Sequence, residues 1–202
     1  MLKSIKKIRK LAIYLFVLIA FTSLTSCNNK SLNASANNMH INSNKRQVFK
    51  WGTSKKEVIK NKSNKNCIKE KHSLLYENEV LPYIKGVSGY LCEILYQFEK
   101  DKLIGEMYFM TAEKDSVDFI NDYNAIKEAL SQQYGEPYEE KENWKESSDK
   151  ESGLSLEDAI LEGKMNLGSG WLVDDDTVAK LNLSCVNDTL FFTIGYKPMA
   201  QK

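Results

Sequence analysis

Cys27 is the residue whose chemistry is most clearly marked by its neighbours. It directly follows Leu24-Thr25-Ser26, a short run with the small residues typical of a cleavage site. Before that run come the apolar residues 11–21 and, within the first ten positions, five positive charges. A basic start, a short apolar core and a small-residue site predict a secretory signal peptide. Cleavage there would make Cys27, a thiol nucleophile, the first residue of the exported chain.

The segment Leu24-Thr25-Ser26-Cys27 resembles the lipobox of bacterial lipoproteins. In those proteins the thiol accepts diacylglycerol and the preceding peptide is removed, so the resemblance implies lipidation of Cys27. More than one acyl chain on the cysteine fits stable anchoring. An ordinary signal peptide cut elsewhere and an uncleaved anchor are the alternatives, although the apolar run is shorter than the roughly 20 residues that span a bilayer. We expect an exported protein held at the cell membrane or the outer membrane.

Composition divides the chain into three parts. Residues 1–26 form the expected signal peptide, residues 27–47 are rich in Asn and Ser and typical of a flexible tether, and residues 48–202 suffice for one folded domain. Residues 48–100 carry ten lysines and six acidic residues, whereas residues 101–202 carry ten lysines and 21 acidic residues. The acidic second half argues against a nucleic-acid partner, which requires a concentrated basic surface.

Three cysteines belong to the predicted domain: Cys67, Cys92 and Cys185. An exported protein can form disulfides, but an odd number of cysteines leaves at least one thiol unpaired. Cys92 and Cys185 lie on apolar faces of predicted strands, which favours buried thiols, with a disulfide as the alternative.

No catalytic or metal-binding pattern lies in the predicted domain. His72 is its one histidine, and there is no H-E-x-x-H, C-x-x-C, Gly-x-Ser-x-Gly or phosphate-binding glycine loop. Asp174-Asp175-Asp176 lacks the alternating ligands and closing glutamate of an EF-hand loop. Glu139-Glu140 and Glu157-Asp158 fall on polar stretches that we expect to be exposed, unlike an acid/base pair in a cleft. We therefore expect no catalytic residue, no cofactor, no metal and no enzymatic activity.

Trp51 is the candidate residue for a partner surface. It stands directly before Gly52 and a predicted helix. Packing in the core at the start of that helix is the favoured interpretation. Contact with a partner is the alternative, because aromatic residues often anchor interfaces.

Hydrophobic periodicity in the domain predicts helices and antiparallel strands. A capping box of Ser54 and Glu57 predicts the first helix, and an apolar stripe that stops at Gly135 predicts a long one. The expected helices are 55–61, 116–134 and 155–163; the expected strands are 73–77, the hairpin 89–98 and 103–111, 137–144, and a three-stranded meander that ends near residue 196.

This order predicts an α+β fold in which helices pack on an antiparallel sheet. It also suggests two tandem helix-plus-three-strand units that share the sheet. Whether the chain carries an internal duplication, with a boundary near residue 112, stays open, because identity between the halves is weak.

The segment Gly52-Thr53-Ser54-Lys55-Lys56-Glu57-Val58 resembles the Gly-x-Thr/Ser-x-x-Glu/Gln-Val opening of small envelope lipoproteins of the BamE (SmpA/OmlA) type. The resemblance covers residues 48–112 and implies a helical start followed by a three-stranded sheet. The Gly-x-Pro that usually follows that family's first helix is missing, and Asn61-Lys62-Ser63-Asn64 occupies the region. The tandem arrangement is also similar to that of β-lactamase-inhibitor-like proteins. Neither family supplies a catalytic residue.

Together these features predict a lipid-anchored, exported lipoprotein of the cell envelope that acts as a protein-binding or assembly-scaffold module. Small-ligand binding is the alternative, and an envelope hydrolase is a distant third. The expected partners are the membrane, through Cys27, and an envelope protein.

Overall fold

A computed structural model describes residues 49–62, 67–77, 91–113 and 118–199 of the 202-residue chain. The expected signal peptide, Cys27 and the expected tether lie outside these residues. Their boundaries at 26 and 47 therefore stay predictions. In the described part of the chain, no helix is long and apolar enough to cross a membrane.

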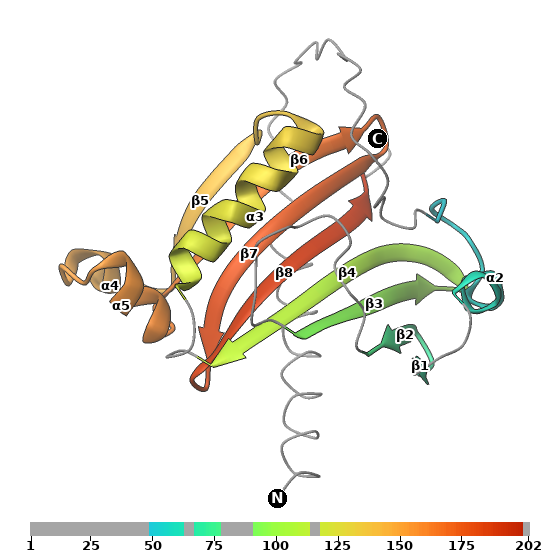
Figure 1. Ribbon diagram of the computed structural model, residues 1–202, viewed down its shortest axis with the longest axis horizontal. Helices are drawn as coiled ribbons and strands as arrows, with labels where there is room; N and C mark the ends of the chain where they lie inside the picture. The colour runs from blue at the N-terminus through green and yellow to red at the C-terminus, as the bar shows by residue number, and fades with distance from the viewer. Residues whose placement is uncertain (1–48, 63–66, 78–90, 114–117, 200–202) are drawn as a thin grey trace, which may run out of the picture. The chain divides into compact units, whose positions relative to one another are not determined.

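The described strands form one antiparallel sheet of eight strands in the order β1-β2-β3-β4-β8-β7-β6-β5 (Figure 1). The first and second halves of the chain meet in its middle, where β4 and β8 pair from Glu106 opposite Tyr196 to Glu113 opposite Thr189. The bounds are β1 Cys67–Lys69, β2 Ser73–Tyr76, β3 Leu91–Glu99, β4 Lys102–Glu113, β5 Glu139–Trp144, β6 Met165–Asp174, β7 Thr177–Val186 and β8 Thr189–Pro198.

Tight turns set the register of the two longest hairpins. Lys100 and Asp101 join β3 to β4, and Asn187 and Asp188 join β7 to β8. All four residues have positive φ values, between 48° and 64°. Positive φ at both central positions is the geometry of the two-residue turns whose twist matches that of paired strands. The predicted hairpin, in which a strand ending at residue 98 is followed by one starting at residue 103, is confirmed.

Four helices accompany the sheet in the described residues: α2 Lys55–Asn61, α3 Phe119–Tyr134, α4 Ser147–Glu151 and α5 Leu156–Leu161. The predicted cap of α2 is confirmed, because the Ser54 hydroxyl accepts a hydrogen bond from the Glu57 backbone N–H at 3.3 Å. Helix α3 starts after Asp118 and stops at Gly135, whose φ of 87° favours glycine.

Helix α3 packs on strands β6 to β8 through apolar contacts and hydroxyl pairs (Figure 1). The Tyr123 hydroxyl lies 2.8 Å from Ser169 Oγ, and the Trp171 indole N–H donates to Ser131 Oγ at 3.2 Å. On the same side, Val58 of α2 and Ile160 of α5 belong to the same apolar cluster. We call this side of the sheet the helix face. Its strand residues include Tyr96, Tyr108, Trp171, Leu181, Phe192, Ile194 and Tyr196.

The expected α+β class with two tandem helix-plus-three-strand units is wrong. One continuous eight-stranded sheet dominates the described residues, and three of the four helices have seven residues or fewer. Each half contributes four strands rather than three, and the eight residue pairs between β4 and β8 join the halves. The expected strands also omit β1, whose three residues form a strand through pairing with β2. The architecture is mainly β.

Candidate functional site

The side of the sheet opposite the helix face carries an unusual set of apolar side chains. Because successive strand residues point to opposite faces, the neighbours of the helix-face residues define this second face. Register aligns Leu75, Leu95 and Met107 across β2, β3 and β4, with Phe109 in the next row of this face and Phe191 in the row after it. These five side chains are between 2 and 9 % exposed.

The described helices do not supply the side chains that would cover the second face. The buried residues of α2 and α3, and Ala159 and Ile160 of α5, all belong to the cluster on the helix face. Helix α4 buries no side chain. An antiparallel sheet with one wet face alternates apolar and polar residues, whereas strands covered on both faces are apolar without a break. Residues 106–110 and 190–194 are buried without a break, and all but Glu106 and Thr193 are apolar, so β4 and β8 resemble strands of the second kind.

A polar group near the apolar strip lacks a partner. Ser184 on β7 stands opposite Phe191 and is 2 % exposed, and its hydroxyl has no hydrogen-bond partner among the described residues. Next to it, the Asn182 side chain reaches Thr193 Oγ1 at 3.5 Å. A buried hydroxyl without a partner costs about 1–3 kcal/mol. A bound segment that offers a polar backbone group to the Ser184 hydroxyl would therefore remove this cost.

Charged residues form one edge of the second face, on β5 and β7. The Glu139 carboxylate pairs with Lys180 at 2.9 Å and with Lys141. Partial burial acts to raise the pKa of Glu139, but hydrogen bonds from Lys141 and Lys180 outweigh it and hold the pKa below its ordinary value. Two of the most exposed large apolar side chains lie close by: Tyr138, which directly precedes β5, and Leu172 on β6. The edge thus offers both signs of charge beside apolar surface.

The helix face holds a buried carboxylate that sequence reasoning missed. Glu106 is 2 % exposed and accepts a hydrogen bond from the Tyr108 hydroxyl at 2.5 Å. Register places Tyr96 and Tyr196 directly beside it on the neighbouring strands. The ring of Tyr196 packs edge to face against that of Tyr108 at 6.1 Å. This tyrosine cluster surrounds the carboxylate in the core, and among the described residues no group of three potential metal ligands includes it.

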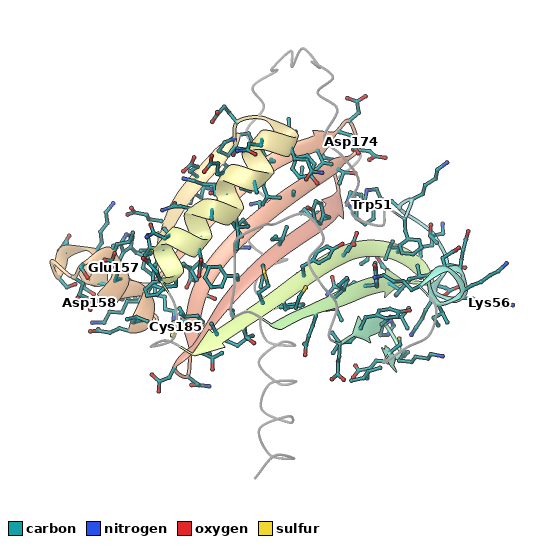
Figure 2. All side chains as sticks on the ribbon, viewed as in Figure 1. Trp51, Lys56, Glu157, Asp158, Asp174 and Cys185 are labelled. Carbon is teal, nitrogen blue, oxygen red and sulfur yellow. The ribbon has the colours of Figure 1, made fainter. Side chains whose placement is uncertain are left out.

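Trp51 lies half-buried against the core rather than free on the surface (Figure 2). Its indole N–H donates to the Thr177 hydroxyl at 2.9 Å, and Thr177 donates to Asp176 at 2.7 Å. Burial acts to raise the pKa of the nearby Asp174, but hydrogen bonds from Thr177 and Asp176 outweigh it and lower the pKa. The acidic turn is therefore held by its own hydrogen bonds and by Trp51.

The other candidate site residues from the sequence do not come together in one site among the described residues. Cys27 lies outside the described residues. Within the described ranges no group of three potential metal ligands comes together, and no disulfide joins Cys67, Cys92 and Cys185. The predicted burial of Cys92 and Cys185 is confirmed, at 7 and 4 % exposure. Glu157 and Asp158 open the short helix α5, where the Ser155 hydroxyl accepts from the Asp158 N–H at 3.1 Å.

Sequence reasoning did not single out the second face, although a signal for it exists. Met107 to Met110 and Leu190 to Ile194 are nearly unbroken runs of large residues, which is the pattern of strands covered on both sides. Comparison with protein-family models, with curated proteins and with solved structures gives no significant match to this chain. The resemblance to BamE-type lipoproteins therefore stays a prediction.

Proposed function

We propose that this protein is an exported, lipid-anchored module of the cell envelope that binds an apolar segment of a partner protein on the second face of its sheet. The burial pattern of β4 and β8 is the observation that carries the proposal. Both strands bury large side chains on each face of the sheet, and the described helices cover one of these faces. The signal peptide and the cysteine that follows it support export and anchoring.

The size of the apolar strip supports the proposal, because these side chains would be costly to leave in water. Burying one large apolar side chain stabilises a protein by about 1.5–3 kcal/mol, so five such side chains represent on the order of 10 kcal/mol. That is comparable to the whole net stability of a domain. The expected tether over residues 27–47 is rich in Asn and Ser and offers few apolar groups. A partner segment meets the need if it brings apolar side chains and a backbone group for Ser184.

The test compares capture of envelope proteins by three forms: the full chain, a soluble chain that starts at residue 28, and the soluble chain with Asn182→Arg. Asn182 lies half-buried on the second face, so arginine there adds bulk and charge where the partner would sit. Gln132→Arg, exposed on α3, is the matched control. We expect the full chain, the soluble chain and the Gln132 variant to capture the same protein in stoichiometric amount, and the Asn182 variant to lose it.

Two results would overturn the proposal. A soluble chain that captures no protein and binds no apolar dye would show that the chain itself closes the second face. A soluble chain that binds apolar small molecules but no protein would favour the small-ligand alternative.

The anchor is tested separately, by labelling cells with an alkyne fatty acid. Cys27→Ser should abolish the label and release the protein from membranes, whereas Cys67→Ser should retain both. A label that survives Cys27→Ser would disprove the lipobox interpretation.

A further inference from the structure

The two edges of the sheet carry opposite charge. At the β1 edge, residues 50–62, 69–72 and 99–102, which include α2, the β1–β2 turn and the β3–β4 turn, contain nine lysines and four acidic residues, a formal +5. At the β5 edge, residues 139–162 contain nine acidic residues and three lysines, a formal −6. Figure 2 shows Lys56 at one end of the view and Glu157 and Asp158 at the other.

The lysines of the first group gather because three segments meet there. The backbone N–H of Lys55 donates to Asp101 at 3.3 Å, and the Lys55 ammonium donates to the Glu70 carbonyl. Ser54 forms a β-bridge with Lys102. We call this surface the basic end; its lysines are Lys50, Lys55, Lys56, Lys60, Lys62, Lys69, Lys71, Lys100 and Lys102, of which all but Lys55 and Lys62 are exposed.

Residues 139–162 at the β5 edge, which we call the acidic edge, are too distant to neutralise the charge of the basic end. Neighbouring strands lie about 4.8 Å apart, so the seven steps from β1 to β5 amount to roughly 34 Å. This is several times the Debye length of about 8 Å at physiological ionic strength. An anionic surface at the basic end therefore interacts with the lysine charges, whereas the charges of the distant acidic residues are screened.

The expected tether joins the domain at the basic end. Its last residue, 47, comes three positions before Lys50, and Lys50 immediately precedes the segment that packs beside α2. A flexible chain of this length has a root-mean-square span of roughly 25 Å. The acyl chains expected on Cys27 would thus hold the basic end, rather than the acidic edge, near the membrane.

We propose that the basic end binds the anionic lipid headgroups of the membrane that carries the protein, and so orients the domain with its acidic edge away from that membrane. Stable membrane association commonly combines a lipid chain with a basic surface. Each lysine near an anionic surface strengthens binding by about fivefold. The inference rests on the proposed membrane location, but it does not involve the second face.

The test uses the soluble chain from residue 28, which carries no acyl chain, with vesicles of phosphatidylcholine with or without phosphatidylglycerol. The basic-end variant is Lys56→Gln with Lys60→Gln and Lys71→Gln. The control, with the same change in net charge, is Lys145→Gln with Lys150→Gln and Lys164→Gln near the acidic edge. We expect co-sedimentation with the phosphatidylglycerol vesicles alone, at least a tenfold loss in the basic-end variant or at high salt, and little change in the control.

Equal binding to both vesicle types, no binding to either, or equal losses in the two triple variants would overturn this inference. Circular dichroism of each variant establishes that it is folded. Because Asn182→Arg alters the second face alone, it should bind phosphatidylglycerol vesicles like the parent chain. Failure of partner capture and failure of vesicle binding are therefore separate results.

Discussion

Trp51 and Thr177 lie 126 positions apart in the chain, and the Trp51 indole N–H donates a 2.9 Å hydrogen bond to the Thr177 hydroxyl. The contact joins the segment before α2 to the start of β7 and thus links the two halves of the sheet a second time, beyond the pairing of β4 with β8. It gives Trp51 a packing role that a free surface residue would not have.

Replacing Trp51 with phenylalanine should lower the free energy of unfolding by about 1 kcal/mol, because the ring is largely kept and one hydrogen bond is lost. Urea denaturation followed by circular dichroism measures the change. Trp144→Phe is the matched control: the buried Trp144 Nε1 has no hydrogen-bond partner among the described residues, so its removal should cost little. If Trp51→Phe left stability unchanged and weakened partner capture, Trp51 would be an interface residue instead.

The pair of Tyr123 and Ser169 predicts a stability loss at alkaline pH. Burial and the nearby Glu140 charge raise the pKa of Tyr123 from 10.0 to about 12, although the hydrogen bond with Ser169 acts in the opposite sense. The fold therefore favours the neutral phenol, and this contribution is complete below the unfolded pKa and is lost as pH rises from 10.0 through about 12.

Tyr123→Phe should cost about 1 kcal/mol at neutral pH, because the buried Ser169 hydroxyl loses its partner. The variant should also lose less stability than the parent over the alkaline range. Adding Ser169→Ala should recover part of the neutral-pH loss. Urea midpoints across pH give both readings, and parallel curves for parent and variant would contradict the assignment.

The ion pairs of Glu139 predict an acid-dependent contribution at the edge of the second face. Its folded pKa is lowered, so the stabilisation is present above the ordinary value of 4.5 and is lost as pH falls through the folded value. Because the pairs are partly exposed, Glu139→Gln should cost no more than about 1 kcal/mol at neutral pH and nothing once the carboxyl is protonated. Glu142 is exposed on the same strand, so Glu142→Gln should leave the free energy of unfolding unchanged at both pH values. An equal loss for Glu139→Gln at neutral and acid pH would refute the ion-pair account.

The register of the sheet predicts that the three cysteines of the domain stay reduced. Cys92 on β3 and Cys185 on β7 are separated by three strand spacings, or about 14 Å, whereas bridged Cα atoms lie within about 7 Å. Cys67 on β1 is two strand spacings from β3, about 10 Å. Alkylation of the denatured soluble chain without reductant, followed by mass spectrometry, should therefore label Cys67, Cys92 and Cys185 in every molecule. A mass lower by two hydrogens, with two sites unlabelled, would show a disulfide that this fold does not permit.

Local signals in the sequence predicted the local elements well. The bounds of α2, the β3–β4 hairpin and the stop of α3 at Gly135 all follow from caps, turns and periodicity within a few residues. The long-range features could not be found that way. Strand β1 exists because it pairs with β2, and the Trp51–Thr177 contact depends on how the two halves meet.

The second face shows how a partial pattern misleads. In β3 the polar residues Glu93 and Gln97 lie on one side, as on a solvent-exposed face, yet Leu95 lies between them on that same side and is buried. In β4 and β8 large residues occur at both parities, so alternation alone cannot tell which face the helices cover. The fold class was wrong because the number of predicted helices says little about their length: three of the four described helices have seven residues or fewer.

The most direct test of the central claim is site-specific photo-crosslinking of the full chain in living cells. A photoreactive amino acid at Asn182 reports on the second face, and one at Gln132 of α3 reports on the exposed side of the helix. The account predicts one discrete crosslinked protein from position 182 and none from position 132. A crosslink at 132 with none at 182, or none at either position, would contradict a binding role for the second face.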